Sequence, residues 1–302
     1  WNISRQIVWG IRIPIWYCQE EHVTVSQNRP ERCGECGKIK LTQETDTFDT
    51  WFSSAQWPFA TLEANSQKDL KRFYPTQVME TAYDILMFWV MRMLMMGLYR
   101  TGKVPFETVY LHGLIRDEKG QKMSKSKGNV INPLDVVKTY GADALRMALV
   151  IRSTPGLDKG VGQGDIRAMR NLTNKIWNAA RFIMMNRENS KSQDTRNKQI
   201  SNANDQEFRE KLDGVVKQVT TQLNDFRIGL AADTVYDKFW HWFCDEAIEK
   251  NKQGEVSDGA LREGLVTFLK LLHPFVPFVT EAVWGELKQQ KMLMLSQWPK
   301  TS

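Results

Sequence analysis

The sequence predicts an α/β domain with a parallel sheet, followed by an all-α bundle of helices. Two observations predict this order. β-branched and aromatic residues, which favour strands, are dense at the start of the chain, and helical spacing of apolar residues continues almost unbroken from Asp165 to Leu287. With 302 residues, 42% of them hydrophobic and 25% charged, the chain has the composition of a folded protein and the length of two domains.

The first half is expected to combine short strands with one long helix. Residues 1–17 favour short strands, and the polar stretch 63–71 suits a surface loop or a short helix. A helix is predicted over Thr81–Tyr99, with Thr81 as N-cap, Asp84 in the first turn and Gly102 as terminator. Its residues are apolar almost all round, so the helix is expected to be buried.

A strand is predicted over Thr108–Ile115, and a loop rich in glycine and lysine follows it. Strand, long helix and strand in succession indicate an α/β unit with a parallel sheet. The sequence Asn132-Pro133-x-Asp135 predicts a helix start, and Gly141 predicts its end. Two polar breaks indicate connections between bundle helices, namely residues 186–205 and 251–258.

The composition limits the classes of function. Forty-one basic and 35 acidic residues give a net charge of +6, which suits a polyanionic partner and equally suits ordinary solubility. Asp84 and Arg92 interrupt the longest apolar stretch, so we expect no membrane-spanning helix and a cytosolic protein. The 4 cysteines are too few for a disulfide framework. Because the chain opens on Trp1, we expect it to be a fragment of a longer protein.

The strongest functional motif is Lys122-Met123-Ser124-Lys125-Ser126-Lys127-Gly128-Asn129, between a predicted strand and a predicted helix start. Lysines on a glycine-flanked loop can reach the phosphates of a nucleotide and stabilise negative charge on a leaving pyrophosphate. The hydroxyls of Ser124 and Ser126 can hold the loop or donate to phosphate oxygens. A solvated basic turn is the alternative. The first five residues, however, resemble the signature loop of the class I aminoacyl-tRNA synthetases.

Other segments narrow the resemblance to the valyl-tRNA synthetases. They are Ile3-Ser4-Arg5-Gln6, Trp9-Gly10, Arg12-Ile13-Pro14, Asp49-Thr50-Trp51-Phe52-Ser53-Ser54, Tyr83–Met93 and Leu271–Glu281. Isoleucyl enzymes typically have Asp at the position of Ser53. The resemblance covers nearly the whole chain and implies four regions: a connective region after a missing editing insertion, with a candidate zinc knuckle (1–45), the second half of a Rossmann catalytic domain (46–130), a helical connecting segment (131–164) and a helical anticodon-binding domain (165–302).

The resemblance implies a valine pocket made by Trp51, Ile85 and Trp89. Ile85 and Trp89 are four residues apart on the predicted helix and so share a face, although plain core packing explains the same pattern. Asp84 is either a helix-capping carboxylate or, by resemblance, the acid that binds the ribose of ATP. Ala82 departs from the family, which commonly has Gly there, and its methyl group is expected to impede the nucleoside.

The resemblance also implies roles around the signature loop: ATP binding by His112, Gly113, Met123 and Lys125, and catalysis by Lys122, Ser124, Lys125 and Ser126. His112 is alternatively a structural residue at a strand end. The family's other ATP-binding signature, a His-Ile-Gly-His type sequence, does not occur in residues 1–302. These residues alone are therefore expected to be inactive.

Three of the cysteines suggest a zinc site. Cys33 and Cys36 have the two-residue spacing of a zinc knuckle, and Cys18 can supply a third thiolate. Structural zinc requires four ligands, and either Glu21 or His22 can complete a Cys3Glu or a Cys3His set. The alternative is a vestigial knuckle without metal.

The helical region is expected to bind tRNA. Four basic residues on one predicted helix are candidates for backbone contacts, or else members of a solvated face: Arg167, Arg170, Lys175 and Arg181. Ten aromatic residues are predicted to pack in the core rather than to stack on bases: Trp177, Phe182, Phe239, Trp240, Trp242, Phe243, Phe268, Phe275, Phe278 and Trp284.

Together these features predict the activity of the family they resemble. We expect a monomer that activates valine with Mg2+-bound ATP, forming valyl-adenylate, and transfers valine to tRNA(Val). Two alternatives stay open, an isoleucine-type sibling synthetase and a non-catalytic tRNA-binding module.

Overall fold

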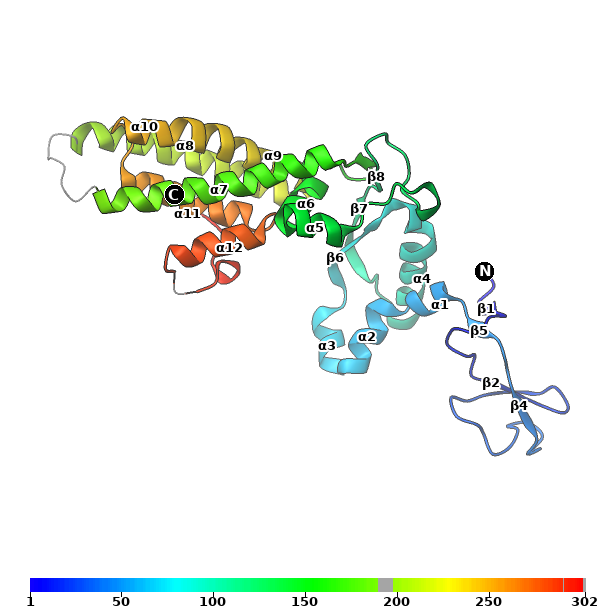
Figure 1. The fold of residues 1–302 in the computed structure, drawn as a ribbon. Coiled ribbons are helices and arrows are strands. Elements are labelled where there is room, and N and C mark those ends of the chain that lie inside the picture. Colours follow the sequence, from blue (N-terminus) through cyan, green and yellow to red (C-terminus); the bar gives the residue numbers. More distant parts are fainter. Residues whose placement is uncertain (190–197, 290, 301–302) are drawn as a thin grey trace. The chain divides into compact units, whose positions relative to one another are not determined.

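The structure, a computed structural model, describes residues 1–189, 198–289 and 291–300 (Figure 1). The chain divides into two units, Trp1–Leu111 and His112–Ser302, and each has its own buried apolar clusters. Strands and helices mix in the first unit and helices dominate the second, which confirms the predicted order of α/β fold and helical bundle. Among the described helices, none is long and apolar enough to cross a membrane.

The first unit opens with short antiparallel strands, as predicted for its β-branched residues. Strand β1 (Ser4–Arg5) pairs with β5 (Thr47–Phe48). Between them, β2 (Ile15–Cys18) lies in the middle of a three-stranded sheet, flanked by β3 (Val23–Val25) and β4 (Leu41–Gln43). Cys18 ends β2, and Cys33 and Cys36 lie in the segment between β3 and β4. Cys18 and Cys33 form a buried cluster with Trp16 and Leu41, and Cys36 packs against it.

An α/β segment follows in the same unit. Helices α1 (Thr50–Ser54), α2 (Trp57–Asn65) and α3 (Gln67–Phe73) precede strand β6 (Thr76–Ala82), and helix α4 (Met91–Thr101) precedes strand β7 (Phe106–His112). The amide of Thr76 donates to the carbonyl of Pro105, 2.9 Å away. Because this bond joins the beginnings of two neighbouring strands, β6 and β7 run parallel, as the strand–helix–strand pattern predicts.

The predicted start of the long helix is wrong. Thr81 is not an N-cap but a buried residue of β6, and the helical region begins as a 3-10 turn (Tyr83–Ile85) followed by a π-helical turn (Leu86–Val90). Burial of a β-branched side chain in the sheet outweighs its capping propensity here. The end is correct, since Gly102 terminates α4 with a φ of 72°.

Only one face of this helical region is buried. Val90 and Met93 pack with Met79 and Phe106 of the two strands, and Gly97 is buried beside Tyr74 and Pro105. The rest of this region leaves seven large apolar residues exposed within the described structure: Tyr83, Met87, Phe88, Met91, Met95, Leu98 and Tyr99. The expectation of all-round burial is therefore wrong within this unit.

The second unit begins with a small parallel pair of strands, β8 (Ile115–Arg116) and β9 (Lys159–Gly160). Helices α5 (Pro133–Tyr140) and α6 (Ala142–Val150) lie between them in the chain. The side chain of Asn132 accepts from the Leu134 amide at 3.1 Å, which confirms the predicted cap of α5.

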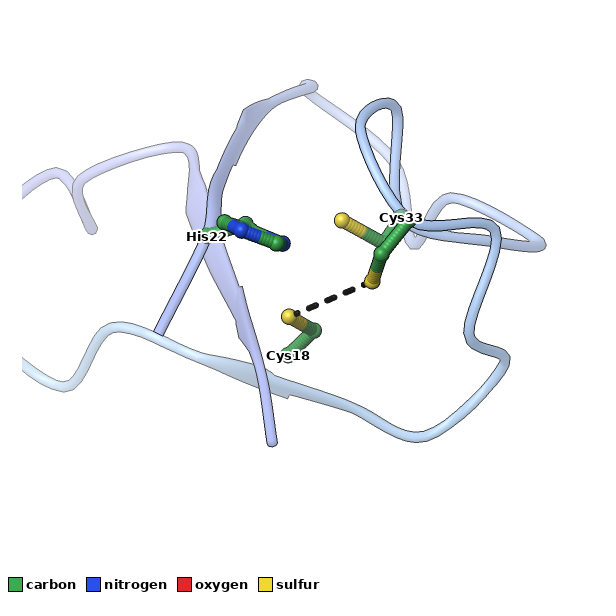
Figure 2. A group of neighbouring side chains, drawn as sticks. Cys18, His22 and Cys33 are labelled. Atoms are coloured by element: carbon green, nitrogen blue, oxygen red, sulfur yellow. Dashed lines mark hydrogen bonds between the residues drawn. The ribbon is translucent and has the colours of Figure 1, made fainter. Parts of the chain in front are cut away.

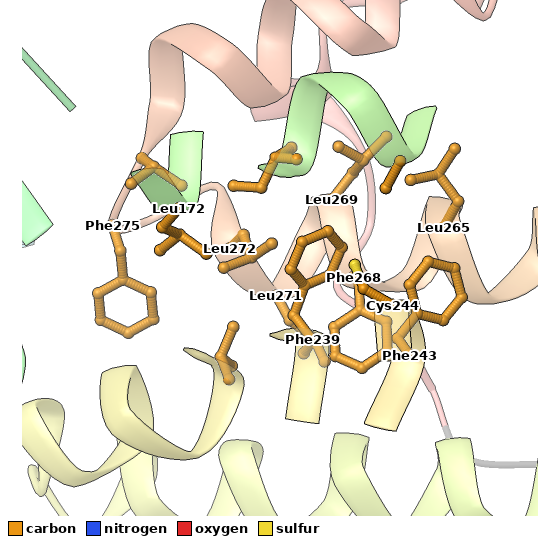
Figure 3. Close-up of a cluster of buried hydrophobic side chains, with 14 of the residues drawn as sticks. Leu172, Phe239, Phe243, Cys244, Leu265, Phe268, Leu269, Leu271, Leu272 and Phe275 are labelled. Carbon is orange, nitrogen blue, oxygen red and sulfur yellow. The ribbon is translucent and has the colours of Figure 1, made fainter. Parts of the chain in front are cut away.

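The bundle follows, and its long helices surround one large apolar core (Figures 1 and 3). Its elements are α7 (Gln163–Asn189), α8 (Lys198–Asn224), α9 (Ile228–Asp237), a π-helical segment (Lys238–Ala247), α10 (Ile248–Lys252), α11 (Asp258–Leu272), α12 (Pro277–Glu286) and a 3-10 turn (Leu293–Leu295). The ring of Phe268 lies 5.1–5.9 Å from the rings of Phe239, Trp242 and Phe243. The break near 251–258 is a connection between helices, as predicted, whereas residues 190–197 of the other break lie outside the described residues.

Candidate functional site

The signature loop follows β8 in the second unit and is held closed by one asparagine. The backbone amide of Ser124 donates to Asn129 Oδ1 at 2.9 Å, and Asn129 Nδ2 donates to the Lys122 carbonyl at 3.3 Å. The same Nδ2 donates to Asp117 Oδ2 at 2.9 Å. One side chain therefore ties both arms of the loop to the turn that precedes it.

The loop itself exposes its functional groups. Lys122 and Ser126 are exposed and Met123 is half-buried. The hydroxyls of Ser124 and Ser126 are 3.2 Å apart, and the Lys127 amide donates to the Ser124 carbonyl at 3.2 Å, closing a 3-10 turn over Lys125–Lys127. The side chain of Lys125 lies outside the described part of the chain. The described lysines can accordingly meet an anion from solvent.

The turn before the loop is anchored by Asp117. Its carboxylate accepts from the amides of Lys119 (3.0 Å) and Gln121 (2.7 Å) as well as from Asn129. These hydrogen bonds hold the pKa of Asp117 below its ordinary value, and the bond from Asn129 has the largest effect. An open cavity of about 840 Å³ lies beside this turn, lined among others by Asp117, Lys127 and Asn129. The sequence pattern assigned no role to Asp117, and none to Asn129 beyond its place at the end of the motif, although Asp and Gly at the two ends of Asp117-Glu-Lys-Gly120 indicate a turn.

The strand end before the loop is closely packed. A Cβ added to Gly113 would lie 1.7 Å from the Leu157 carbonyl oxygen, so only glycine fits there. His112 is half-buried, and its Nδ1 lies 2.8 Å from the Gly113 carbonyl. Asp158 accepts from the Leu114 amide at 2.8 Å and pairs with Arg116. The backbone that carries the loop is thereby fixed by contacts on both sides.

In the first unit, the three residues of the predicted valine pocket lie around the junction of α1 and the helical region before α4. Trp51, Ile85 and Trp89 are all half-buried, and Trp89 Nε1 donates to the Ser54 carbonyl at 3.4 Å. The rings of Trp51 and Phe88 are 6.0 Å apart. Apolar side chains that are partly accessible at one junction can bind a small branched side chain.

Asp84 and Ala82 stand at the exit of β6. Asp84 is exposed in the 3-10 turn and does not cap it, so the capping interpretation is wrong. Ala82 is extended, with φ of −69° and ψ of 144°, a conformation open to any residue. An exposed carboxylate at the carboxyl end of a parallel strand is suitably placed for a ribose hydroxyl.

The cysteine cluster brings four donors together, as Figure 2 shows for Cys18, His22 and Cys33. One ligand atom from each of these residues and from Cys36 lies within 4.8 Å of all the others. The Sγ atoms of Cys18 and Cys36 are 3.7 Å apart. A tetrahedron with Zn–S bonds of about 2.3 Å has an edge of about 3.8 Å. The structure thus favours His22 over Glu21 as the fourth member.

Two observations test whether zinc fits these residues. Among the described residues, none forms a hydrogen bond with the buried Nδ1 of His22. Its Nε2 lies 3.7 Å from a Glu35 carboxylate oxygen, an arrangement typical of a metal-bound imidazole whose other nitrogen is oriented by a carboxylate. The amides of Cys36 and Glu35 lower the pKa of Cys33 to about 6, which favours its thiolate. The pKa of Cys36 is raised, because burial and the neighbouring thiols of Cys33 and Cys18 outweigh the Lys38 amide, which lowers it. The donor set suits a zinc ion.

In the second unit, α7 presents the predicted tRNA-binding residues. Arg167, Arg170 and Arg181 are exposed, opposite the buried face of the helix. Lys175 is instead paired with Asp245 at 2.8 Å and lies over the Trp240 ring, 5.1 Å from its centre. Of the four residues, Lys175 is therefore the least available for contact with tRNA.

Two aromatic residues do not pack in the core as predicted. Trp177 is 38% exposed and Phe278 is 65% exposed, and both line an open cavity of about 330 Å³. Trp177 follows Arg170 by seven residues and precedes Arg181 by four, so it lies on the exposed stripe of α7 that carries the arginines. Helical spacing from Arg167 could have indicated this placement.

Comparisons with known proteins agree with the motifs. Residues 1–161 match the family model described as tRNA synthetases class I (I, L, M and V), and residues 205–302 match that of the anticodon-binding domain of tRNA ligase. A valine–tRNA ligase of Clostridium acetobutylicum is 42% identical over 311 residues, covering 99% of this chain and 35% of that protein. One from Dehalococcoides mccartyi is 46% identical over 299 residues, covering 95% and 33%. The chain thus spans about a third of the length of these relatives.

Solved structures share the fold. The ternary complex of an Agrobacterium radiobacter K84 LeuRS with tRNA and LeuAMS superposes with a TM-score of 0.84 at 22% identity, covering 100% of this chain and 42% of that one. A Mycobacterium tuberculosis methionyl-tRNA synthetase in complex with methionyl-adenylate gives a TM-score of 0.66 at 18% identity, covering 95% and 54%.

Proposed function

The chain belongs to the class I tRNA synthetases of the I, L, M and V type, and we propose that it forms part of a valine–tRNA ligase. In this role the polypeptide that contains it activates valine with Mg2+-bound ATP and transfers valine to tRNA(Val). The observation that carries the proposal is the signature loop Lys122–Asn129, which the side chain of Asn129 holds closed and which presents lysine and hydroxyl groups beside a closely packed strand end. The identity to valine–tRNA ligases of 42–46% over nearly the whole chain supports the choice of amino acid.

The loop residues stabilise the phosphates during adenylation. Lys122 and Lys125 neutralise the charge that develops on the leaving pyrophosphate, while Ser124 and Ser126 donate to phosphate oxygens or hold the loop. His112, Gly113 and Met123 line the adenosine, and Asp84 accepts hydrogen bonds from the ribose hydroxyls. No covalent protein intermediate is needed, because positioning and electrostatics supply the catalysis.

Trp51, Ile85 and Trp89 form the apolar side of the valine pocket. A pocket of this kind excludes larger side chains better than it rejects threonine, which has the same shape as valine. The arginines of α7 contact the tRNA backbone, and the exposed Trp177 between them offers a face on which a base can stack. Zinc held by Cys18, His22, Cys33 and Cys36 would supply local folding stability to the small sheet.

Amino-acid-dependent ATP–pyrophosphate exchange tests the proposal in the full polypeptide that contains this chain. Valine should support exchange, and Lys125→Ala should lower it by more than about tenfold, a loss of over about 1.4 kcal/mol of transition-state stabilisation. A smaller loss contradicts the role of Lys125. Residues 1–302 alone should show no exchange, since they hold only one of the family's two ATP-binding signatures.

The same assay separates the alternatives. Exchange that depends on isoleucine rather than valine would identify an isoleucine-type sibling. If the full polypeptide binds tRNA on a filter but exchanges with neither amino acid, it is a non-catalytic tRNA-binding module.

A further inference from the structure

A buried carboxylate organises the short helix that carries Trp51. Asp49 is 5% exposed and stands at the N-cap of α1, where its Oδ1 accepts from the Trp51 amide at 3.4 Å. Its other oxygen, Oδ2, accepts from Trp1 Nε1 at 2.7 Å and pairs with Arg5 at 3.2 Å. Both carboxylate oxygens are therefore engaged, and the orientation of α1 depends on them.

The same carboxylate faces a buried cation on the helical region of α4. Arg92 Nη1 lies 3.7 Å from Asp49 Oδ2, and the Arg92 side chain is only 14% exposed. Nη1 makes no hydrogen bond within the described structure, so the charge of Asp49 is its nearby compensation. The guanidinium also lies 4.1 Å from the centre of a Trp1 ring and 6.0 Å from that of Trp51.

The far end of α1 fixes the second tryptophan. Trp89 Nε1 donates to the carbonyl of Ser54, the last residue of α1, at 3.4 Å. Trp89 lies three residues before Arg92 in the same helical region. Helix α1 is thus joined to that region at both ends, by the Asp49–Arg92 pair at one and by the Trp89 indole at the other.

We propose that Asp49 and Arg92 are positioning residues that set the separation of Trp51 and Trp89 and thereby the selectivity of the amino-acid pocket. This inference rests on the proposed function, because it assigns the two tryptophans to that pocket. Removing the charge of Asp49 leaves the guanidinium of Arg92 without its neighbouring carboxylate. Removing Arg92 leaves Asp49 paired with Arg5 and Trp1 only, which do not lie on the helical region that carries Trp89. In both variants the link at this end of α1 is lost, so α1 shifts relative to Trp89. A pocket that excludes larger side chains by shape loses that exclusion when its walls move.

The test uses Asp49→Asn and Arg92→Met in the full polypeptide that contains this chain. Asparagine is as good an N-cap as aspartate, so Asp49→Asn removes the charge while keeping the cap of α1. Each variant should raise the KM for valine about tenfold, leave the KM for ATP within about twofold, and lower the preference for valine over isoleucine. The double variant should be no worse than either single one, because residues that act as a pair are not additive.

A matched control is Glu63→Gln, which removes the ion pair of Glu63 with Arg100 at 2.9 Å, also between α4 and a neighbouring helix. It should leave the valine KM unchanged. Arg92→Lys keeps the charge and should restore most of the valine preference lost in Arg92→Met. Additive effects, or equal changes in both KM values, would overturn the proposal.

A second readout does not depend on activity. With 5-fluorotryptophan incorporated, and the resonances assigned by Trp51→Phe and Trp89→Phe, Asp49→Asn and Arg92→Met should shift the fluorine signals of Trp51 and Trp89 together. Unmoved signals in folded variants would sink the positioning role even if valine exchange is normal. If the parent protein shows no valine exchange while the paired shifts occur, the proposed function fails and the positioning of the tryptophans stands.

Discussion

The side-chain amide of Asn129 bridges the signature loop to the carboxylate of Asp117, 2.9 Å away. Asn129 is the last residue of the motif and Asp117 lies in the turn before it, so the bond closes the loop at its base. With the Ser124 amide also bound to Asn129 Oδ1 at 2.9 Å, one side chain satisfies groups from three points of the chain. The loop can therefore expose its lysines while these hydrogen bonds hold its backbone in one conformation.

We predict that Asn129→Ala raises the pKa of Asp117 toward its ordinary value, because the Asn129 hydrogen bond is the largest cause of the lowered pKa. A carboxyl whose pKa is lower in the folded state stabilises the fold above its unfolded pKa, and that contribution is lost as pH falls through the folded pKa. Asn129→Ala should thus make the local fold less sensitive to acid in this range. Carbon-13 NMR titration of the aspartate carboxyls measures the shift.

The control for this titration is Asn132→Ala, which removes the cap of α5 instead. Asn132 Nδ2 donates to Asp135 Oδ2 at 2.8 Å, and its Oδ1 accepts from the Leu134 amide, so its side chain serves α5 rather than Asp117. If Asn132→Ala moves the Asp117 midpoint as far as Asn129→Ala does, the bridge is not the cause.

Local signals in the sequence were enough for parts of this site. The Asn132 cap and the glycine end of α4 each depend on a few neighbouring residues, and both were predicted correctly. The spacing of Cys33 and Cys36 indicated a cluster with Cys18, and the structure brings these residues together, while zinc binding stays a prediction. The start of the long helix was not predicted correctly, because Thr81 has a capping side chain but is buried in a sheet whose partner strand, β7, lies more than twenty residues away. Tertiary burial overrides a local propensity there.

Contacts between distant residues were the second gap. Asp49 binds Trp1, which lies 48 residues before it, and pairs with Arg92, which lies 43 residues after it. No local sequence pattern indicates contacts between residues so far apart. The choice of His22 over Glu21 likewise depends on how the strand turns after Cys18, which places one neighbour in the cluster and the other in solvent.

Chelation should separate the cysteines into two classes. If zinc is bound by Cys18, His22, Cys33 and Cys36, removing it should make the three knuckle thiols reactive toward a disulfide reagent at neutral pH and loosen only the residues around them. Cys244 is the internal control, since burial raises its pKa to about 12 and it should react only when the bundle unfolds. Protein that contains no zinc as purified, with all three knuckle thiols already reactive, would rule the site out.

Replacing two glycines of the bundle by alanine should change the free energy of unfolding in opposite directions. A Cβ at Gly264 of α11 would lie 2.6 Å from the Phe208 ring and 2.7 Å from the Phe243 ring, whereas a Cβ at Gly214 of α8 meets nothing within 4 Å. Gly264→Ala should therefore destabilise by about 1–3 kcal/mol through overpacking. Gly214→Ala should stabilise by about 0.4–1 kcal/mol, because alanine restricts the unfolded chain. Denaturant unfolding followed by circular dichroism measures both, and equal effects of the two substitutions would contradict the close packing of Gly264 against Phe208 and Phe243.

The exposed stripe of α7 should divide tRNA binding into a charge contribution and a stacking contribution. Arg170→Ala removes a phosphate contact, so it should weaken binding and reduce the slope of log affinity against log salt by about 1. Trp177→Ala removes a stacking face, so it should cost about 1–3 kcal/mol while leaving the salt slope unchanged. Filter binding of tRNA(Val) to the full polypeptide across a salt series measures both quantities.

Arg209→Ala is the control for this experiment. It removes the same charge from α8, where Arg209 pairs with Glu263 at 3.0 Å, and it should change neither the affinity nor the salt slope. A Trp177→Ala variant that binds tRNA as the parent does would return Trp177 to the role of an exposed packing residue, and a slope lowered equally by Arg209→Ala would mean that net charge, not the α7 stripe, carries the binding.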